Sequence, residues 1–91
     1  MGPEFDWDEA NLRHIARHRV RPEEVEQVFS NDPMIVGAQD DQQEERSLCF
    51  GRTNAGKFFT VIYTERKGKI RVVTAYWMTR AQQRMYLTGR W

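Results

Sequence analysis

The chain has 91 residues and a formal net charge of +1. This length suits one domain with a modest core, and no apolar run is long enough to span a bilayer, so we expect neither a membrane protein nor a secretory leader. We interpret residues 1–4 as a cloning remnant and residues 5–91 as the single domain. The lone Cys49 cannot form an internal disulfide, which indicates a reducing cytoplasm and favours a small buried side chain over a reactive thiol.

The small net charge conceals an asymmetry along the chain. Residues 1–45 contain twelve Asp or Glu against four Lys or Arg, a balance of −8, whereas residues 46–91 contain ten Lys or Arg against one acidic residue, a balance of +9. If the two halves fold apart, the basic half can orient the protein toward a polyanion. If the halves interleave in space, the two fields largely cancel, and the sequence leaves both arrangements open.

A first helix is predicted over residues 7–18. Asp8 is a suitable N-cap because its carboxylate can accept hydrogen bonds from the free amides of the first turn. Leu12, Ile15 and Ala16 recur at helical spacing and are expected to face the core.

A second helix is predicted over residues 21–29. Pro22 fits the first turn, where its missing amide is tolerated, and Val25, Val28 and Phe29 form an apolar stripe. We interpret the three glutamates of this helix as a solvated face, with contact to a basic partner as the alternative.

Two strands and a polar loop are predicted next. Residues 34–36 form a short strand, residues 37–44 read as a mobile acidic loop that a partner could order, and residues 46–52 form the second strand. Residues 53–56 are expected to be a hairpin loop.

The clearest pattern is a hairpin made of residues 58–64 and 70–77. Both runs are rich in β-branched and aromatic residues, and Gly68 between them can adopt the positive φ of a tight turn. A third helix is predicted over residues 79–87, with Gly89 ending it. The fold class is therefore α+β, with two N-terminal helices, a four-stranded, mainly antiparallel sheet and a C-terminal helix, the helices covering one face.

The residues that can carry chemistry are mainly basic and aromatic. No metal-binding triad, nucleophile motif or phosphate-binding loop is present, so we expect no metal and no other cofactor. Arginine binds phosphate through forked hydrogen bonds, and aromatic rings stack on unpaired bases. The basic and aromatic set comprises Arg46, Arg52, Tyr63, Arg66, Arg71, Tyr76, Trp77, Arg80 and Arg84.

RNA cleavage without a metal needs a base for the 2′-hydroxyl, a cation for the charged phosphorane and an acid for the leaving oxygen. Of the two histidines, His18, beside Arg17, is the better candidate for the base or the acid. The alternative is that His18 caps the end of the first helix, where it favours the helix dipole. His14 shares a helix face with His18 but has no third metal ligand at a recognisable spacing.

Arg71 is the most informative position because it places a charge in the middle of an apolar strand. Its side chain must emerge on an open face or find a partner, for which Glu65 on the neighbouring strand is a candidate. Strict alternation places Arg71 on the side of Val73, opposite to Thr74 and Tyr76. One site can include all of them only at the end of the sheet or on an uncovered face.

We divide the candidate residues into two groups. The catalytic candidates are His18, Arg46, Arg71 and Tyr76, and the RNA-binding candidates are Arg17, Arg52, Tyr63, Trp77 and Arg80. The alternative interpretation of the two tyrosines is that they are half-buried aromatic residues of the sheet. The alternative interpretation of Trp77 is that it closes the core.

The order and spacing of several short segments resemble those of the BrnT family of bacterial toxins. The matching segments are residues 7–11, 14–18, 22–26, 32–33, 45–46, 51–53, 61–63, 70–75 and 78–79, with Tyr86. The resemblance implies a RelE-like fold, a ribonuclease that arrests translation, and neutralisation by a BrnA-like antitoxin with a ribbon-helix-helix part. It also implies RNA as substrate and a homodimer or a toxin–antitoxin hetero-oligomer, with the acidic loop and second helix as antitoxin surfaces.

The resemblance extends to single positions and has three departures. His18, Arg46 and Arg71 match motif residues of the family. Arg19 stands where the family usually has glycine, Tyr76 and Trp77 replace an arginine followed by Asp or Arg, and Gln82 replaces a glutamate. These departures keep a second hypothesis open, a catalytically impaired BrnT-like protein-binding module. A third is a nucleic-acid-binding protein without a partner.

Overall fold

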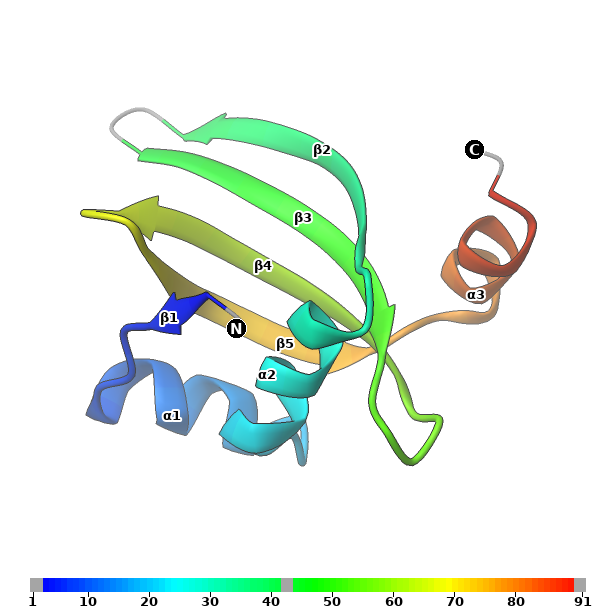
Figure 1. Ribbon diagram of the computed structural model, residues 1–91, viewed down its shortest axis with the longest axis horizontal. Helices are drawn as coiled ribbons and strands as arrows, with labels where there is room; N and C mark the ends of the chain where they lie inside the picture. The colour runs from blue at the N-terminus through cyan, green and yellow to red at the C-terminus, as the bar shows by residue number, and fades with distance from the viewer. Residues whose placement is uncertain (1–2, 42–43, 90–91) are drawn as a thin grey trace.

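The computed structural model describes residues 3–41 and 44–89. In chain order the elements are β1 (Glu4–Phe5), α1 (Glu9–Ala16), α2 (Pro22–Ser30), β2 (Met34–Asp41), β3 (Glu44–Arg52), β4 (Phe58–Arg66), β5 (Lys69–Trp77) and α3 (Arg80–Thr88) (Figure 1). The strands form one sheet in the order β1-β5-β4-β3-β2. The α+β class is confirmed, with three helices in the described part of the chain, none of which is long and apolar enough to cross a membrane.

The sheet is mixed and has five strands, where the sequence predicted four that were mainly antiparallel. The additional strand β1 pairs in parallel with β5, with Glu4 opposite Lys69 and Phe5 opposite Ile70. The Phe5 ring also contacts Phe29 of α2 at a centroid distance of 5.4 Å. A strand of two residues has no periodicity of its own, so only its long-range partner reveals it.

The interpretation of residues 37–44 as a mobile loop was wrong for the described residues. Residues 37–41 continue β2, and Glu44 begins β3, so the two strands form a long antiparallel hairpin; residues 42 and 43 lie outside the described residues. β2 is an edge strand of the sheet. An edge strand pairs through its backbone and tolerates a polar sequence without the alternation that predicts a strand.

The first helix begins as predicted but presents another face to the core. Asp8 caps α1 by accepting from the Asn11 amide at 3.0 Å. Ile15 is fully buried, but Leu12 is 37% exposed and Ala16 is exposed, while Asn11 is only 2% exposed. The inward stripe is therefore Asn11 and Ile15, because α1 packs against β5, at one side of the sheet.

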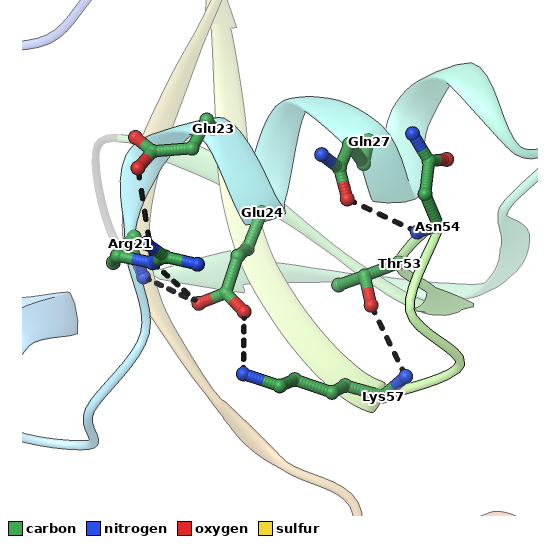
Figure 2. A network of polar contacts seen from close by, with 7 residues as sticks. All are labelled: Arg21, Glu23, Glu24, Gln27, Thr53, Asn54 and Lys57. Atoms are coloured by element: carbon green, nitrogen blue, oxygen red, sulfur yellow. Dashed lines mark hydrogen bonds and ion pairs between the residues drawn. The ribbon is translucent and has the colours of Figure 1, made fainter.

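Glu24 of α2 is buried, which corrects its interpretation as part of a solvated face. Its carboxylate accepts from Lys57 Nζ at 2.9 Å and from the Arg21 amide at 3.0 Å (Figure 2). Burial tends to raise the pKa of Glu24, but these hydrogen bonds and the charges of Lys57 and Arg21 outweigh it and hold the pKa below its ordinary value. The contact ties α2 to the loop between β3 and β4.

The main core lies between the sheet and the helices α1 and α2, which lie on the same side of it (Figure 1). Its buried members are Ile15, Val20, Val25, Val28, Cys49, Phe59, Val61, Tyr63, Ile70, Val72 and Ala75. Burial raises the pKa of the Cys49 thiol to about 12, so the thiol stays protonated at neutral pH.

The third helix does not join the other two, although the sequence predicted all helices on one face. Along β4, Phe59 and Val61 belong to the main core, so Phe58 and Thr60 point to the opposite face. α3 contacts that face, through a hydrogen bond from Thr60 Oγ1 to Gln82 Oε1 at 3.0 Å and a ring contact of Phe58 with Tyr86. We call this face, which α1 and α2 leave uncovered, the open face.

Gly51 of β3 allows α2 to approach the sheet closely. A Cβ atom built at Gly51 would lie 2.5 Å from Cγ1 of Val28, which is fully buried. Because overpacking a core strains it, we expect Gly51→Ala to lower the free energy of unfolding by about 2 kcal/mol in urea denaturation. The matched control is Gly37→Ala, where a Cβ meets nothing within 4 Å and a change beyond about 0.5 kcal/mol would contradict this packing account.

Arg19 follows α1 in a left-handed conformation, with φ at 59°. This conformation is costly for a side chain bearing Cβ and free for glycine, so we expect Arg19→Gly to raise the free energy of unfolding by about 1 kcal/mol. The control is Arg17→Gly, because Arg17 is right-handed with φ at −59° and should lose stability on the same change. If both variants lost stability in thermal unfolding, backbone strain at Arg19 would be excluded.

Candidate active site

A β-bulge in β5 reverses the alternation that the sequence predicts. Ile62 of β4 lies opposite Thr74, but the next residue, Tyr63, lies opposite Val72, so Val73 is an inserted residue. Residues on either side of such an insertion change faces relative to strict alternation. Arg71 and Thr74 therefore share the open face.

The same register places Tyr76 on the open face, because it pairs with Thr60, which points to that face. Arg71 pairs with Thr64, which points to the same face as Thr60. In β3, Ser47 lies opposite Tyr63, which brings Arg46 next to Thr64. Arg46, Thr64 and Arg71 thus form one row across three neighbouring strands.

This row borders a pocket of about 170 Å³ at the junction with α1. The pocket is lined by Ala10, Asn11, His14, Arg46, Thr64, Arg71, Val72 and Val73. Arg46 and Arg71, two of the predicted catalytic residues, therefore meet in one cavity. His14 and Thr64 join them, and neither was among the catalytic candidates. Helical spacing did mark His14, since it shares a face with His18, but gave no reason to prefer it.

The orientation of His14 is fixed by the bulge. Its Nδ1 atom lies 3.1 Å from the carbonyl oxygen of the inserted residue Val73. A carbonyl oxygen only accepts, so Nδ1 carries the hydrogen and the neutral ring leaves Nε2 without one. The His14 side chain is exposed, so Nε2 is available to accept a proton from a ligand.

Arg71 is held by carboxylates of the N-terminal segment, not by Glu65 as the sequence suggested. Its Nη2 atom lies 2.7 Å from Asp8 Oδ2, and Nη1 lies 3.6 Å from Asp6 Oδ2. The hydrogen bond to Asp8 raises the pKa of Arg71. The pKa of Asp8 is lowered, mainly by the hydrogen bond from the Asn11 amide and next by the hydrogen bond from Arg71. Arg71 therefore anchors α1 in addition to lining the pocket.

The ion pairs also settle how the two charged halves of the chain are arranged. Asp6 and Asp8 of the acidic half bind Arg71 of the basic half. Glu24 of the acidic half binds Lys57 of the basic half. The halves interleave at these contacts, which favours partial cancellation of the field over two separately charged ends.

His18 lies beyond the end of α1 and outside the pocket lining. Its ring contacts Tyr76 at a centroid distance of 6.0 Å and an interplanar angle of 69°. Tyr76 shares the open face with Arg71. The structure thus places the four catalytic candidates in two pairs, Arg46 with Arg71 in the pocket lining and His18 with Tyr76 outside it.

The predicted RNA-binding residues do not form one surface. Tyr63 is only 5% exposed and its ring packs on Phe29 in the core, so it cannot contact RNA as predicted. Burial also raises the pKa of Tyr63. Trp77 is 49% exposed, but it packs on Phe59, away from the open face, with Lys57 Nζ 5.8 Å from its ring.

The remaining three RNA-binding candidates are exposed and come from different elements. Arg17 caps the end of α1, and Arg80 begins α3. Arg52 borders a wider pocket, of about 640 Å³, between the end of α2 and the loop after β3. Among residues 3–41 and 44–89, no three His, Cys, Asp or Glu side chains are grouped as a metal site.

Comparison with known families decides what kind of protein carries this pocket. Residues 7–82 match the model of a family described as the ribonuclease toxin BrnT of type II toxin–antitoxin systems. The chain belongs to the BrnT family. It is thus a ribonuclease toxin, with RNA as its substrate and an antitoxin protein as its partner. Comparisons with curated proteins and with solved structures gave no match.

Two departures from the usual BrnT pattern now have a structural explanation. Arg19 adopts the left-handed conformation for which the family's glycine is suited. Gln82 is the third residue of α3 and accepts from the Thr79 amide, a capping role that glutamine and glutamate both perform. The glutamine therefore preserves a structural contact.

Proposed function

We propose that this BrnT chain cleaves RNA without a metal ion at the pocket lined by His14, Arg46 and Arg71. The observation that carries the proposal is the meeting of an imidazole in a fixed tautomer with two guanidinium groups from nearby strands. Imidazole suits proton transfer near neutral pH, and guanidinium suits a phosphate that gains negative charge.

The roles follow from the chemistry of the residues that line the pocket and of the pair of His18 and Tyr76 outside it. His14 Nε2 takes the proton of the ribose 2′-hydroxyl as the 2′-oxygen attacks phosphorus, and Arg46 and Arg71 stabilise the phosphorane. The bond to the 5′-oxygen then breaks, and this oxygen takes a proton from His18, whose ring contacts Tyr76. The products are a 2′,3′-cyclic phosphate and a 5′-hydroxyl.

The two arginines are not equivalent in this proposal. Asp6 and Asp8 offset part of the charge of Arg71, and Arg71 also secures the cap of α1. Arg71→Ala is thus expected to impair both the fold and cleavage. Arg46→Ala provides a second probe of catalysis.

The test is incubation of end-labelled RNA with the purified protein, with and without EDTA. We expect cleavage that is insensitive to EDTA, yields 2′,3′-cyclic phosphate ends and is blocked by 2′-deoxy substitution. Arg46→Ala should abolish cleavage, whereas Arg84→Ala, an exposed arginine of α3, should not. Loss of activity in EDTA, or full activity of Arg46→Ala, would contradict the proposal.

We propose a BrnA-like antitoxin with a ribbon-helix-helix part as the partner, and the cytoplasm, where mRNA is found, as the compartment. The family match supports an antitoxin in general. Size-exclusion chromatography with a candidate BrnA-like protein tests this assignment and the expected homodimer or hetero-oligomer. A stable complex without any RNA cleavage by the free toxin would favour the alternative, an impaired binding module.

A further inference from the structure

Thr64 lies at the centre of the row that borders the pocket. It pairs with Arg71 on β5, and Arg46 lies next to it on β3. All three residues line the cavity together with His14. A ligand between the two arginines would therefore meet the Thr64 side chain.

The Thr64 hydroxyl is buried and has no hydrogen-bond partner within the described chain. Thr64 is 4% exposed, and its Oγ1 atom makes no hydrogen bond to any described residue. Thr60, on the same strand and face, donates its hydroxyl proton to Gln82. A buried hydroxyl without a partner destabilises a fold, and valine would suit a strand equally well. The hydroxyl therefore needs a hydrogen-bond partner that the described residues do not supply.

The pocket suits a small group that accepts hydrogen bonds. Its volume of about 170 Å³ is below the roughly 300–1,000 Å³ of typical ligand pockets, so it suits a phosphate group better than a whole nucleotide. We propose that the Thr64 hydroxyl donates a hydrogen bond to an oxygen of a phosphate bound between Arg46 and Arg71. That this phosphate belongs to RNA rests on the proposed function.

Thr64→Val removes the hydroxyl and keeps the shape of the side chain. Phosphate affinity, measured by NMR titration with inorganic phosphate, is expected to fall about 10–100-fold, the effect of one hydrogen bond to a charged group. The rate of RNA cleavage at low substrate should fall by a similar factor. Thr64→Ser keeps the hydroxyl and should keep both properties.

Thermal unfolding separates this role from a structural one. Thr64→Val is expected to melt at the same or a higher temperature than the wild type, because an unpaired buried hydroxyl is lost. The matched control Thr60→Val loses its bond to Gln82 and should melt at a lower temperature while cleaving RNA normally. A lower melting temperature for Thr64→Val, or unchanged phosphate affinity, would overturn the proposal.

The two proposals fail in different ways. If the wild type binds phosphate in a manner that requires Thr64 but does not cleave RNA, the phosphate site stands and the proposed function falls. If RNA is cleaved equally well by the wild type and Thr64→Val, the proposed function stands and the role of Thr64 falls.

Discussion

Replacing His14 with glutamine is expected to lower the rate of RNA cleavage about 10²–10⁴-fold, the range that a positioned acid or base contributes. Glutamine can still donate to the Val73 carbonyl, but it cannot take the proton of the 2′-hydroxyl. Single-turnover cleavage of labelled RNA measures the effect. Because the His14 side chain is exposed, the free energy of unfolding of the His14→Gln protein should differ from that of the wild type by no more than about 0.5 kcal/mol.

Arg13→Gln is the matched control, because Arg13 is the exposed neighbour of His14 on α1 and lies outside the pocket lining. This variant should cleave RNA at nearly the wild-type rate. A large loss with His18→Gln and none with His14→Gln would instead assign the base to His18, as the sequence alone indicated.

Glu24→Ala is expected to lower the free energy of unfolding by about 3 kcal/mol. Glu24 accepts hydrogen bonds from Lys57 Nζ and the Arg21 amide, and hydrogen bonds to a charged group contribute roughly 1.5–3 kcal/mol each. Urea denaturation measures the loss. The control is Glu23→Ala: the Glu23 side chain is 59% exposed and its contact with Arg21 is at 3.7 Å, so a change above about 1 kcal/mol would contradict this account.

The same carboxylate predicts the sign of the pH dependence. The pKa of Glu24 in the folded protein is below its ordinary value of 4.5, so its contribution is present above pH 4.5 and is lost as the pH falls through the folded-state pKa. Wild-type stability should therefore decline below pH 4.5 more steeply than that of Glu24→Gln. Parallel pH profiles for the two proteins would show that Glu24 does not contribute in this way.

Features determined by a few adjacent residues could be predicted from the sequence. Asp8 and Thr79 cap their helices, Gly89 ends α3 with φ at 69°, and Gly68 turns the central hairpin with φ at 77°. Each signal depends on local hydrogen bonding or on the freedom of glycine at positive φ, so no distant contact is needed to recognise it.

Features that depend on long-range pairing could not be predicted in this way. β1 exists because Phe5 lies beside Ile70, and residues 37–41 of β2 are extended because they pair with β3. The burial of Glu24 likewise depends on Lys57, which is 33 residues away along the chain. None of these contacts has a counterpart in local composition or periodicity.

The candidate site shows both cases. Arg71 was predicted because a charge in an apolar strand needs a function or a partner, and Arg46 because it matches a motif residue of the family. The two do meet in one pocket. Alternation placed Arg71 and Tyr76 on opposite faces, whereas the insertion of Val73 places them on the same face. Val73 stands in a run of β-branched residues, so nothing in the sequence marks the bulge. The choice of His14 over His18 depends on that bulge.

Chemical-shift mapping with an uncleavable 2′-O-methyl RNA would test the location of the active site most directly. We predict that the largest amide shifts on binding occur in His14, Thr64, Arg71 and Val73, around the pocket between α1 and the open face. Shifts confined to Arg52 and the loop after β3, or to the outer side of α3, with none at these four residues, would contradict the assignment.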